Sequence, residues 1–307
     1  MSAGTATLIS GVGLAVAGVR QPADLLALAG PAAIAPPDWL TGRGLRYKDR
    51  ATRLALLAAG EALRDAGLAD TEPPASGRDR TAVVVSTDLG NLDSVCTVAG
   101  TIAKEGVDGT SPMDLPNTSS NVTASWLAIQ HHLRGPNITL CNGIAGGLDA
   151  VSWGRLLIRA GRAERVLVVG CEPDNTVVQR LLGGPPGSRF DGAAALVLEA
   201  EGSAAARGTV NRGEVAGYAR RADLAGAIGV VCPPGTDPAL VLGRPGEAGD
   251  GPAVIDLAAA LGRCSGALGV LQAVAAIGWF DSGRTGPVLA TAADADSAGA
   301  LLLTGRR

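Results

Sequence analysis

The chain has 307 residues, a formal net charge of -3 and no block of Lys and Arg, which argues against a nucleic-acid partner and against an anionic membrane surface. It is 47% hydrophobic, so it can bury a sizeable core, yet only 3% of its residues are aromatic. Ala, Val and Leu must therefore fill that core, and the 44 glycines allow helices and strands to pack closely.

The five cysteines are spread along the chain without a CxxC pair, and the only histidines are the neighbours His131 and His132. A disulfide framework and a metal site are therefore poorly supported, and reduced thiols indicate a cytoplasmic protein. No basic region precedes an apolar run at the N-terminus, and the longest apolar stretches are too short to span a bilayer. The glycines near residue 145 lack a GxGxxG pattern. We accordingly expect no signal peptide, no membrane partner and no bound cofactor.

Hydrophobic periodicity predicts the elements of the first half in chain order. The run 7–18 is expected to be a strand, 23–39 a loop with a short helix, and 49–67 an amphipathic helix that ends near Gly67. A polar link over 71–79 precedes TAVVVST (81–87), a β-branched run typical of a strand buried on both faces. Further helices are expected over 92–104, 121–133 and 145–160, and strands over 137–141, 165–170 and 193–199.

The pattern weakens after Gly202. We expect a strand over 209–218, a Gly- and Pro-rich stretch without a strong period over 225–251, helices over 253–261 and 266–280, and strands over 288–291 and 298–303. Alternating strands and helices predict an α/β layered fold with parallel pairing. We therefore divide the chain into an N-terminal half, 1–205, and a shortened C-terminal half, 206–307.

Several segments, in this order, resemble the ketosynthase family of the thiolase fold. They are YKDRAT (47–52) with EALRDAGL (61–68), the stretch 111–137, GGLDAVSWGRLLIRAGRAERVLVVGCE (146–172), RFDGAAALVLEAEGSAAARG (189–208) and LGRCSGALGVLQAV (261–274). The resemblance implies a layered αβαβα fold of two pseudo-duplicated halves. It also implies that the stretch 111–137 runs at a dimer interface, before the strand and helix that carry the family's nucleophile.

The residues at the working positions of that family are replaced here. A condensing enzyme holds a cysteine thiolate at a sharp strand-to-helix turn, where backbone N–H groups lower its pKa and stabilise an oxyanion. The resemblance puts Ile144 at that position and Arg263 where the Gly-His-Thr segment has its histidine. The family's His-Gly-Thr-Gly-Thr motif has no counterpart over 230–253, and its Gly-Phe-Gly-Gly gate is replaced, roughly, by 293–297.

The run IAGGLDA (144–150) also resembles chain-length factors, which carry Gln in place of Ile144 before the same residues. This resemblance implies a subunit without condensing activity that pairs with an active ketosynthase and acts with a phosphopantetheine-bearing acyl carrier protein. It places Asn117, Asn121, Trp126, Cys141 and Ile144 at or near the interface between the subunits, and the interior helps to shape the tunnel for the growing acyl chain.

Two alternatives remain open. Cys141, three residues before Ile144, is a candidate nucleophile for acyl transfer, although buried strand cysteines are more often inert. The second alternative is a homodimer that binds acyl thioesters without catalysis.

Arg263 is a candidate ligand for a phosphate or carboxylate, and a surface arginine at a helix start is the plainer interpretation. Asn117 and Asn121 more commonly cap backbone groups than perform chemistry in such positions.

Overall fold

The computed structural model describes residues 6–28, 45, 47–68, 80–185, 188–247 and 251–305. The strands are β1 (Thr7–Val16), β2 (Thr81–Ser86), β3 (Asn137–Leu140), β4 (Arg165–Glu172), β5 (Gly192–Ala200), β6 (Gly213–Arg221), β7 (Leu240–Leu242), β8 (Ala253–Ile255), β9 (Val288–Ala293) and β10 (Ala298–Thr304). The helices are α1 (Arg50–Asp65), α3 (Leu92–Glu105), α4 (Val122–Gln130), α5 (Gly146–Arg159), α6 (Thr176–Leu182), α7 (Glu201–Arg207), α8 (Leu224–Val231), α9 (Leu257–Leu261) and α10 (Leu268–Asp281).

The described strands form one sheet in the order β3-β2-β4-β5-β1-β6-β10-β9-β7-β8. The first five strands lie in the order third-second-fourth-fifth-first, and the last five, counted from the far edge, repeat that order. The directions repeat too, because β2 and β7 each have two parallel neighbours, whereas β5 and β10 each have two antiparallel ones. Among the described residues, the strands of the two half-sheets are hydrogen-bonded to each other only where β1 pairs with β6, at Leu8 and Ile9. The fold is therefore the expected thiolase-like pair of pseudo-duplicated halves.

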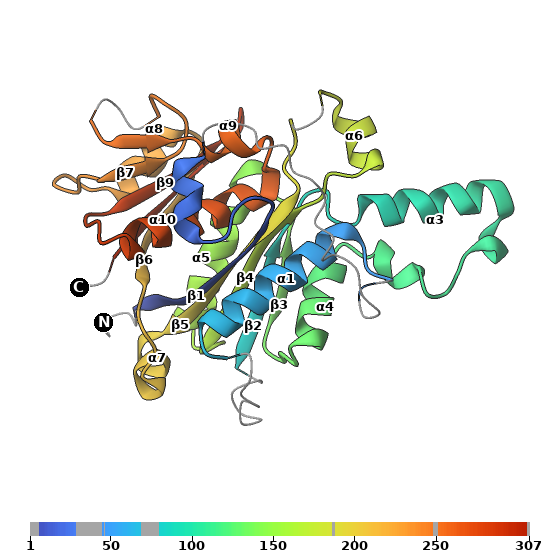
Figure 1. The fold of residues 1–307 in the computed structure, drawn as a ribbon, viewed down its shortest axis with the longest axis horizontal. Coiled ribbons are helices and arrows are strands. Elements are labelled where there is room, and N and C mark those ends of the chain that lie inside the picture. Colours follow the sequence, from blue (N-terminus) through green and yellow to red (C-terminus); the bar gives the residue numbers. More distant parts are fainter. Residues whose placement is uncertain are drawn as a thin grey trace.

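The two half-sheets and the helices that cover them are stacked in five layers, as three apolar clusters show (Figure 1). In β5, Ala193, Ala195 and Val197 face α1, whereas Leu196 and Leu198 face α5 and α10. This alternation follows from the period of two in a strand, so a strand with apolar residues throughout is covered on both faces. On the far side, α8 covers the outer face of the second half-sheet. The expected αβαβα order is confirmed.

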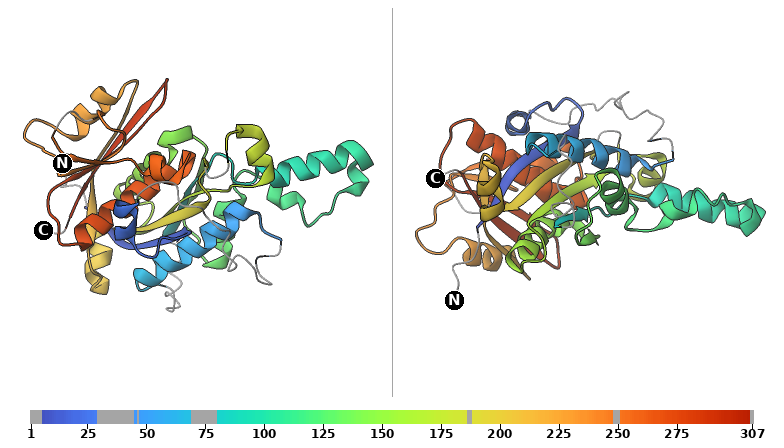
Figure 2. Two further views of the ribbon diagram at one scale, coloured as in Figure 1. Left: turned by 45° about the horizontal axis from the view of Figure 1, so that its top comes forward. Right: turned by 90° about the horizontal axis from the view of Figure 1, so that it is seen from below.

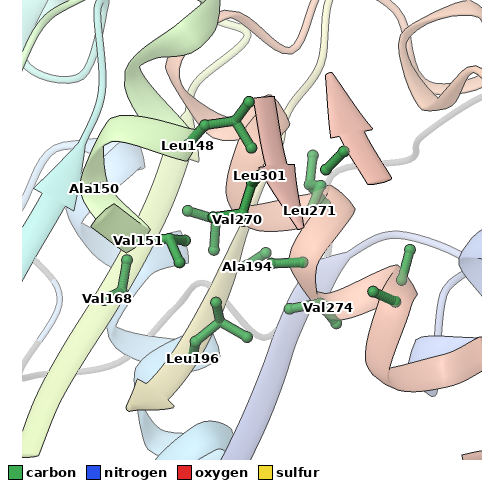
Figure 3. Packing of buried hydrophobic residues seen from close by; sticks show 14 of the residues in the cluster. Leu148, Ala150, Val151, Val168, Ala194, Leu196, Val270, Leu271, Val274 and Leu301 are labelled. Atoms are coloured by element: carbon green, nitrogen blue, oxygen red, sulfur yellow. The ribbon is translucent and has the colours of Figure 1, made fainter. Parts of the chain in front are cut away.

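The central layer consists of α5 and α10, which cross at two glycines. A Cβ atom on Gly147 would lie 2.6 Å from the backbone N of Gly269, and one on Gly269 would strike the backbone N of Leu148. No side chain fits between the helices at this point, so the glycines set how closely the halves approach. Around the crossing, Leu148 and Val151 of α5 and Val270 of α10 fill the space between the two half-sheets (Figure 3).

The expectation of parallel pairing is correct for part of the sheet and wrong for the rest. β2 pairs in parallel with β3 and β4, but β5 is antiparallel to β4, with Glu172 opposite Gly192. β5 therefore starts beside the end of β4, because the chain between them turns through α6 without crossing to the opposite edge of the sheet. The alternation of strands and helices in a sequence does not show whether the chain returns to the starting edge of the sheet before the next strand. It therefore does not fix the direction of that strand.

The second half contains two further corrections. The predicted helix 253–261 is a strand, β8, over its first three residues, because Val254 and Ile255 extend the sheet beside β7. The helix α9 begins only after Asp256, whose carboxylate accepts the N–H of Ala259 at 3.0 Å. The stretch 225–251, where no strong period was found, includes most of α8 and all of β7. The predictions for 29–39 and 71–79 fall outside the described residues.

The proposed boundary between residues 205 and 206 lies within α7, which connects β5 to β6. Glu199, at the end of β5, is fully buried and holds this connection through ion pairs with Arg165 and Arg207, both at 3.1 Å. Ser203 donates a further hydrogen bond to it at 2.7 Å. The boundary itself stays a prediction.

A long arm projects from the body in all three views: α3 and the chain that returns from it (Figures 1 and 2). Of the residues of α3, only Val98 is buried, whereas Val107 and Met113 in the returning chain are 70% and 62% exposed. Such apolar side chains in contiguous exposed segments are typical of surfaces that bind another protein.

We expect Gly269→Ala to lower the free energy of unfolding by about 1–3 kcal/mol, because a methyl group cannot enter the crossing without moving backbone. The matched control is Gly60→Ala in α1, where a Cβ atom meets nothing within 4 Å. That change should raise stability by about 0.5–1 kcal/mol through the helix preference of Ala. Urea unfolding of both variants measures the difference, and equal stabilities would contradict this account of the crossing.

Candidate functional site

Ile144 lies in the turn between β3 and α5, where the sequence comparison placed the lost nucleophile. The turn is a single 3-10 segment, Gly143–Ala145, and Gly143 has a φ of 69°, a value that favours glycine. The Ile144 side chain is half-buried and packs against the central core cluster. It offers neither a nucleophilic atom nor a hydrogen bond at this position.

A second turn faces the first one at the start of α10. It consists of Ser265–Ala267, and Ser265 has a φ of 42°, which is uncommon for a residue with a side chain. The carboxylate of Asp88 contacts both turns: it accepts the N–H of Gly143 at 3.0 Å and the hydroxyl of Ser265. Asp88 thus joins the first residues of two pseudo-equivalent turns.

The carboxyl of Glu172 lies beside Asp88 and is 1% exposed. It accepts backbone N–H groups from Asp88 at 2.7 Å, Leu89 at 3.1 Å and Gly266 at 3.1 Å. Burial, together with the charge of Asp88, raises the pKa of Glu172 to about 8, although the backbone hydrogen bonds act in the opposite direction. A proton is therefore held at the centre of the site near neutral pH.

The pocket beside Ile144 is almost filled. Its cavity volume is about 10 Å³, close to the least that holds one water molecule. Gln272, 1% exposed, lines this pocket and donates to the carbonyl oxygens of Leu242 and Thr291, both at 2.8 Å. Arg244 and the residues after β7 close the opposite side. This pocket has no room for an acyl chain.

The segment 293–297, expected at the family's gate, does lie against the turn, because a Cβ atom on Gly143 would be 3.7 Å from the Asp294 carboxylate. A chain of polar contacts fixes it to α5. Arg220 of β6 donates to Ser297 at 2.9 Å and forms an ion pair with Asp149, which is 6% exposed. Tyr218 also donates to the Asp149 carboxylate. The two halves are thereby tied together directly beside the site.

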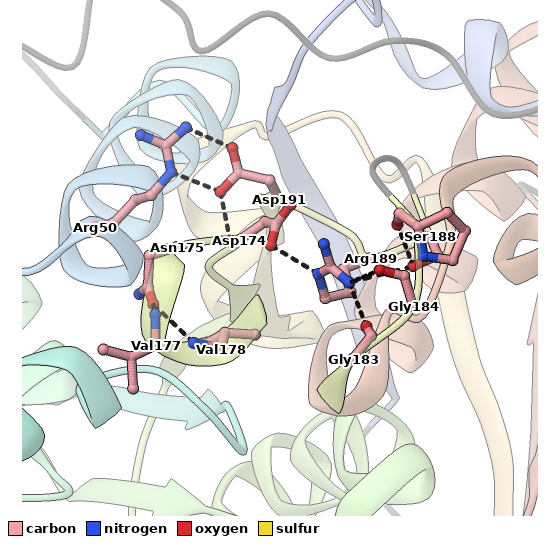
Figure 4. Close-up of polar contacts among 11 residues, drawn as sticks. Arg50, Asp174, Asn175, Val177, Val178, Gly183, Gly184, Ser188, Arg189 and Asp191 are labelled. Atoms are coloured by element: carbon pink, nitrogen blue, oxygen red, sulfur yellow. Dashed lines mark hydrogen bonds and ion pairs between the residues drawn. The ribbon is translucent and has the colours of Figure 1, made fainter. Parts of the chain in front are cut away.

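Arg263 does not line the Ile144 pocket, and its backbone is bound to the loop before β5. Its N–H donates to Ser188 at 2.9 Å and its carbonyl accepts from Phe190, while the residue is exposed. Among the described residues, no hydrogen bond or ion pair to the Arg263 guanidinium is found. Arg189, buried beside it, binds Asp174 at 2.9 Å (Figure 4).

The same network reaches the start of α1. Asp191 receives a bidentate contact from Arg50, at 2.7 and 2.5 Å, and accepts the N–H of Asp174 at 2.9 Å (Figure 4). The Arg189 guanidinium also donates to the carbonyl of Gly183 at 2.5 Å. These contacts fix the loop before β5 and therefore the backbone position of Arg263.

Cys141 is exposed at the end of β3, but its thiol is partly screened from solvent. That burial, together with the negative charges of Asp88 and Glu172, raises the pKa of Cys141. A raised pKa disfavours the thiolate that a nucleophile requires.

The other three predicted residues lie around α4 and the arm. Asn117 is buried and donates to the carbonyl of Tyr47 at 2.8 Å. Asn121 is exposed and accepts the hydroxyl of Ser119 at 2.5 Å. Trp126 is half-buried beneath the ammonium of Lys48, which lies 3.7 Å from the ring centroid. Within the described residues, these contacts lie at the base of the arm and none of them involves the turn of Ile144.

The sequence comparison missed Asp88, Glu172 and Ser265, because nothing in their local pattern distinguishes them from ordinary polar residues. They are separated by 84 and 93 residues in the sequence, and the order of the strands in the sheet brings them together.

In the described part of the chain, no group of three or more His, Cys, Asp or Glu side chains could hold a metal ion. Within the same ranges, no helix is long and apolar enough to cross a membrane.

Residues 38–181 match the family "Beta-ketoacyl synthase, N-terminal domain". The 3-oxoacyl-[acyl-carrier-protein] synthase 2 of Vibrio harveyi is 29% identical over 139 residues, which cover 45% of this chain and 33% of that protein. An actinorhodin polyketide beta-ketoacyl synthase 2 of Streptomyces coelicolor is 31% identical over 246 residues, or 72% of this chain and 58% of that protein. The tetracenomycin polyketide synthase ketoacyl synthase beta subunit of Streptomyces glaucescens is 32% identical over 138 residues, 43% of this chain and 32% of that protein.

The chain thus spans between about one third and three fifths of these relatives. Among solved structures, the ishigamide ketosynthase/chain length factor superposes with a TM-score of 0.77 at 20% identity, covering 98% of this chain and 100% of that one. A type II polyketide ketosynthase in complex with its acyl-carrier protein gives 0.80 at 17% identity, covering 99% and 100%. The likeness in structure establishes the fold, and with the sequence matches it confirms the predicted resemblance to the ketosynthase family.

The buried Glu172 predicts a pH-dependent stability. An ordinary glutamate loses its proton near 4.5, but in the folded chain Glu172 keeps it until about pH 8, so folding takes up a proton between these values. Stability should therefore fall as pH rises through this window, by about 1.4 kcal/mol per pH unit at most, and level off above it.

Glu172→Gln should remove this component of the slope, because an amide cannot ionise and its oxygen still accepts from backbone N–H groups. The control is Glu105→Gln at the exposed end of α3, which should keep the parent slope. Urea unfolding between pH 5 and 9 provides the measurement. A Glu172→Gln variant whose stability falls as steeply as that of the parent would show that this proton is absent.

Proposed function

We propose that this chain is a ketosynthase-like subunit of the chain-length-factor type, without condensing activity, that pairs with an active ketosynthase in type II polyketide or fatty-acid-like biosynthesis. The observation that carries the proposal is the turn before α5. At the position of the family's cysteine stands Ile144, next to a cavity of only about 10 Å³. A condensation needs both a nucleophile and space for its acyl group, and this turn supplies neither.

The surrounding charges support the same conclusion. Condensation develops negative charge on sulfur and on a carbonyl oxygen, so an active site provides N–H groups and cations there. Here the carboxyl groups of Asp88 and Glu172 occupy the N–H groups of Gly143 and Gly266. The side chain at the lost histidine position, Arg263, is exposed and lies outside the pocket. Both carboxyl groups stabilise the backbone around the turns, and the negative charge of Asp88 opposes the development of further negative charge there.

A partner would bind along β3 and the arm. β3 lies at the end of the sheet and, in the described structure, pairs only with β2, which leaves its outer edge open to a second strand. Ile129 of α4, a helix that packs beside β3, is 60% exposed. Met113 of the arm is 62% exposed. An open strand edge flanked by exposed apolar residues fits an active ketosynthase whose own edge strand is free.

The rest of the proposal follows from this pairing. The assembly would act in the cytoplasm with a phosphopantetheine-bearing acyl carrier protein, and no cofactor would bind to this chain. Arg263, exposed and without an ion pair among the described residues, is the cation that could contact the phosphate of the pantetheine arm. The two halves, 1–205 and 206–307, would act as one body.

Co-expression with ketosynthases and an acyl carrier protein tests the pairing. We expect this chain to co-purify with one ketosynthase and to change the chain length of its product. Ile129→Glu should abolish co-purification, because it places a charge in the apolar contact, whereas Val230→Glu on α8, where the parent residue is 51% exposed, should not. The proposal is contradicted if this chain co-purifies with no ketosynthase and leaves the chain length of the product unchanged. A stable homodimer that binds acyl carrier protein would favour the non-catalytic binding alternative.

Acyl transfer by Cys141 is the competing function, since this exposed residue lies three positions before Ile144 and carries a thiol. Its raised pKa predicts slow alkylation near neutral pH, no faster than that of Cys96, which is exposed on the arm. Iodoacetamide labelling followed by peptide mass spectrometry measures both rates in one sample. Selective labelling of Cys141, or an acyl-transfer activity that is lost in Cys141→Ala, would establish the competing function instead.

A further inference from the structure

Two cavities lie at the seam where the two half-sheets separate, one lined by the end of α10 and the loop before β9, the other by β1 and the end of α1. β1 pairs with β6 only at Leu8 and Ile9, so the rest of its edge on that side has no strand beside it. The backbone N–H groups of Val12 and Leu14 donate instead to Asp65 at 2.8 Å and to Glu61 at 3.1 Å, two carboxylates of α1. The seam is therefore open, although its backbone donors are satisfied.

Arg212 forms the wall between the two cavities and lines both of them. The larger cavity, about 500 Å³, lies between the end of α10 and the loop before β9, with Val210, Phe280 and Pro287 as its apolar wall. The smaller one, about 340 Å³, lies between β1 and the end of α1. Each volume falls in the range of small-molecule sites, about 300–1,000 Å³.

The charges of the seam leave cations unmatched. Asp65 and Asp281 are paired with Arg212, and Glu61 and Asp65 also accept backbone N–H groups. In the part of the chain that the structure describes, Arg284 in the larger cavity has no carboxylate within ion-pair distance. Its guanidinium lies over the ring of Trp279, 4.6 Å from the centroid, which holds it in place through a cation–π contact.

Arg64 is in a similar position in the smaller cavity, because it has no ion pair with a described residue. The larger cavity combines an apolar wall with the guanidinium of Arg284, which is held over Trp279 and has no ion pair with a described residue. Such a cavity is complementary to a ligand with one anionic group and a hydrocarbon chain.

We propose that these cavities form a binding site for an amphipathic anion, with a carboxylate or phosphate at Arg284 and a hydrocarbon chain along Val210 and Phe280. Arg64 lies across Arg212 from this site and provides a second, weaker contact for the anionic end of a longer ligand. The site is separate from the Ile144 turn and from the surface assigned to a partner subunit. It does not depend on the proposed function and remains open when the arm is covered.

Isothermal titration of the full chain with decanoate, decyl phosphate and inorganic phosphate tests the site. We expect saturable 1:1 binding of at least one of the two decyl ligands, and the one that binds more tightly identifies the anionic group. Inorganic phosphate should bind at least about tenfold more weakly than that ligand, because it cannot use the apolar wall. Binding should also change the fluorescence of Trp279, and this change should be absent in Trp279→Phe.

Arg284→Gln should weaken binding about tenfold or more, since it removes a charge-assisted hydrogen bond, and Arg64→Gln should weaken it less. Arg162→Gln, an exposed arginine outside both cavities, is the matched control and should leave affinity unchanged. Thermal melting confirms that each variant is folded. The proposal is overturned if neither decyl ligand binds, if Arg284→Gln and the control bind equally well, or if inorganic phosphate binds as tightly as the decyl ligands.

Discussion

The structure depends on the contact between α5 and α10, where Gly147 and Gly269 bring two helix backbones together without a side chain between them. Each helix follows a turn that carries a candidate site residue, so the closeness of the helices decides how near those turns lie. The five-layer stack follows from it, because each half-sheet buries one face against this central pair and the other against α1 or α8. A chain poor in aromatic residues can fill such a thin layer, since Ala, Val and Gly leave little space between backbones.

The turns at Gly143 and Ser265 occupy equivalent places in the two halves, and Asp88 and Glu172 connect them. In an enzyme, backbone N–H groups at such turns would be left for the reacting oxygen. Here carboxyl groups of the chain itself occupy two of them, and the Arg220 contacts fix the adjacent loop. The backbone around both turns is therefore fixed by the chain's own side chains, which agrees with the proposed role without condensing activity.

The replaced residues are recognised through the similarity to ketosynthases, so the extent of that similarity bears directly on the interpretation. Residues 38–181 match the N-terminal domain of that family, yet the chain covers less than two thirds of the relatives described above. Both half-sheets nevertheless have five strands in the same order, so the architecture is retained with shorter strands in the second half, where β7 and β8 have three residues each.

The sequence by itself determined most strands and helices. Runs such as TAVVVST and the spacing of apolar residues in 49–67 indicate which side chains of a segment are buried, and that pattern differs between strands and helices. It also predicted that Ile144 stands where the ketosynthase family has its nucleophile, a comparison of residue identities that needs no coordinates. Only the tertiary structure decided that β5 runs antiparallel to β4, that Arg263 points outward, and that Asp88, Glu172 and Ser265 meet at one point. These features depend on contacts between residues far apart in the chain, and a local pattern carries no information about which distant backbone N–H a carboxylate will reach.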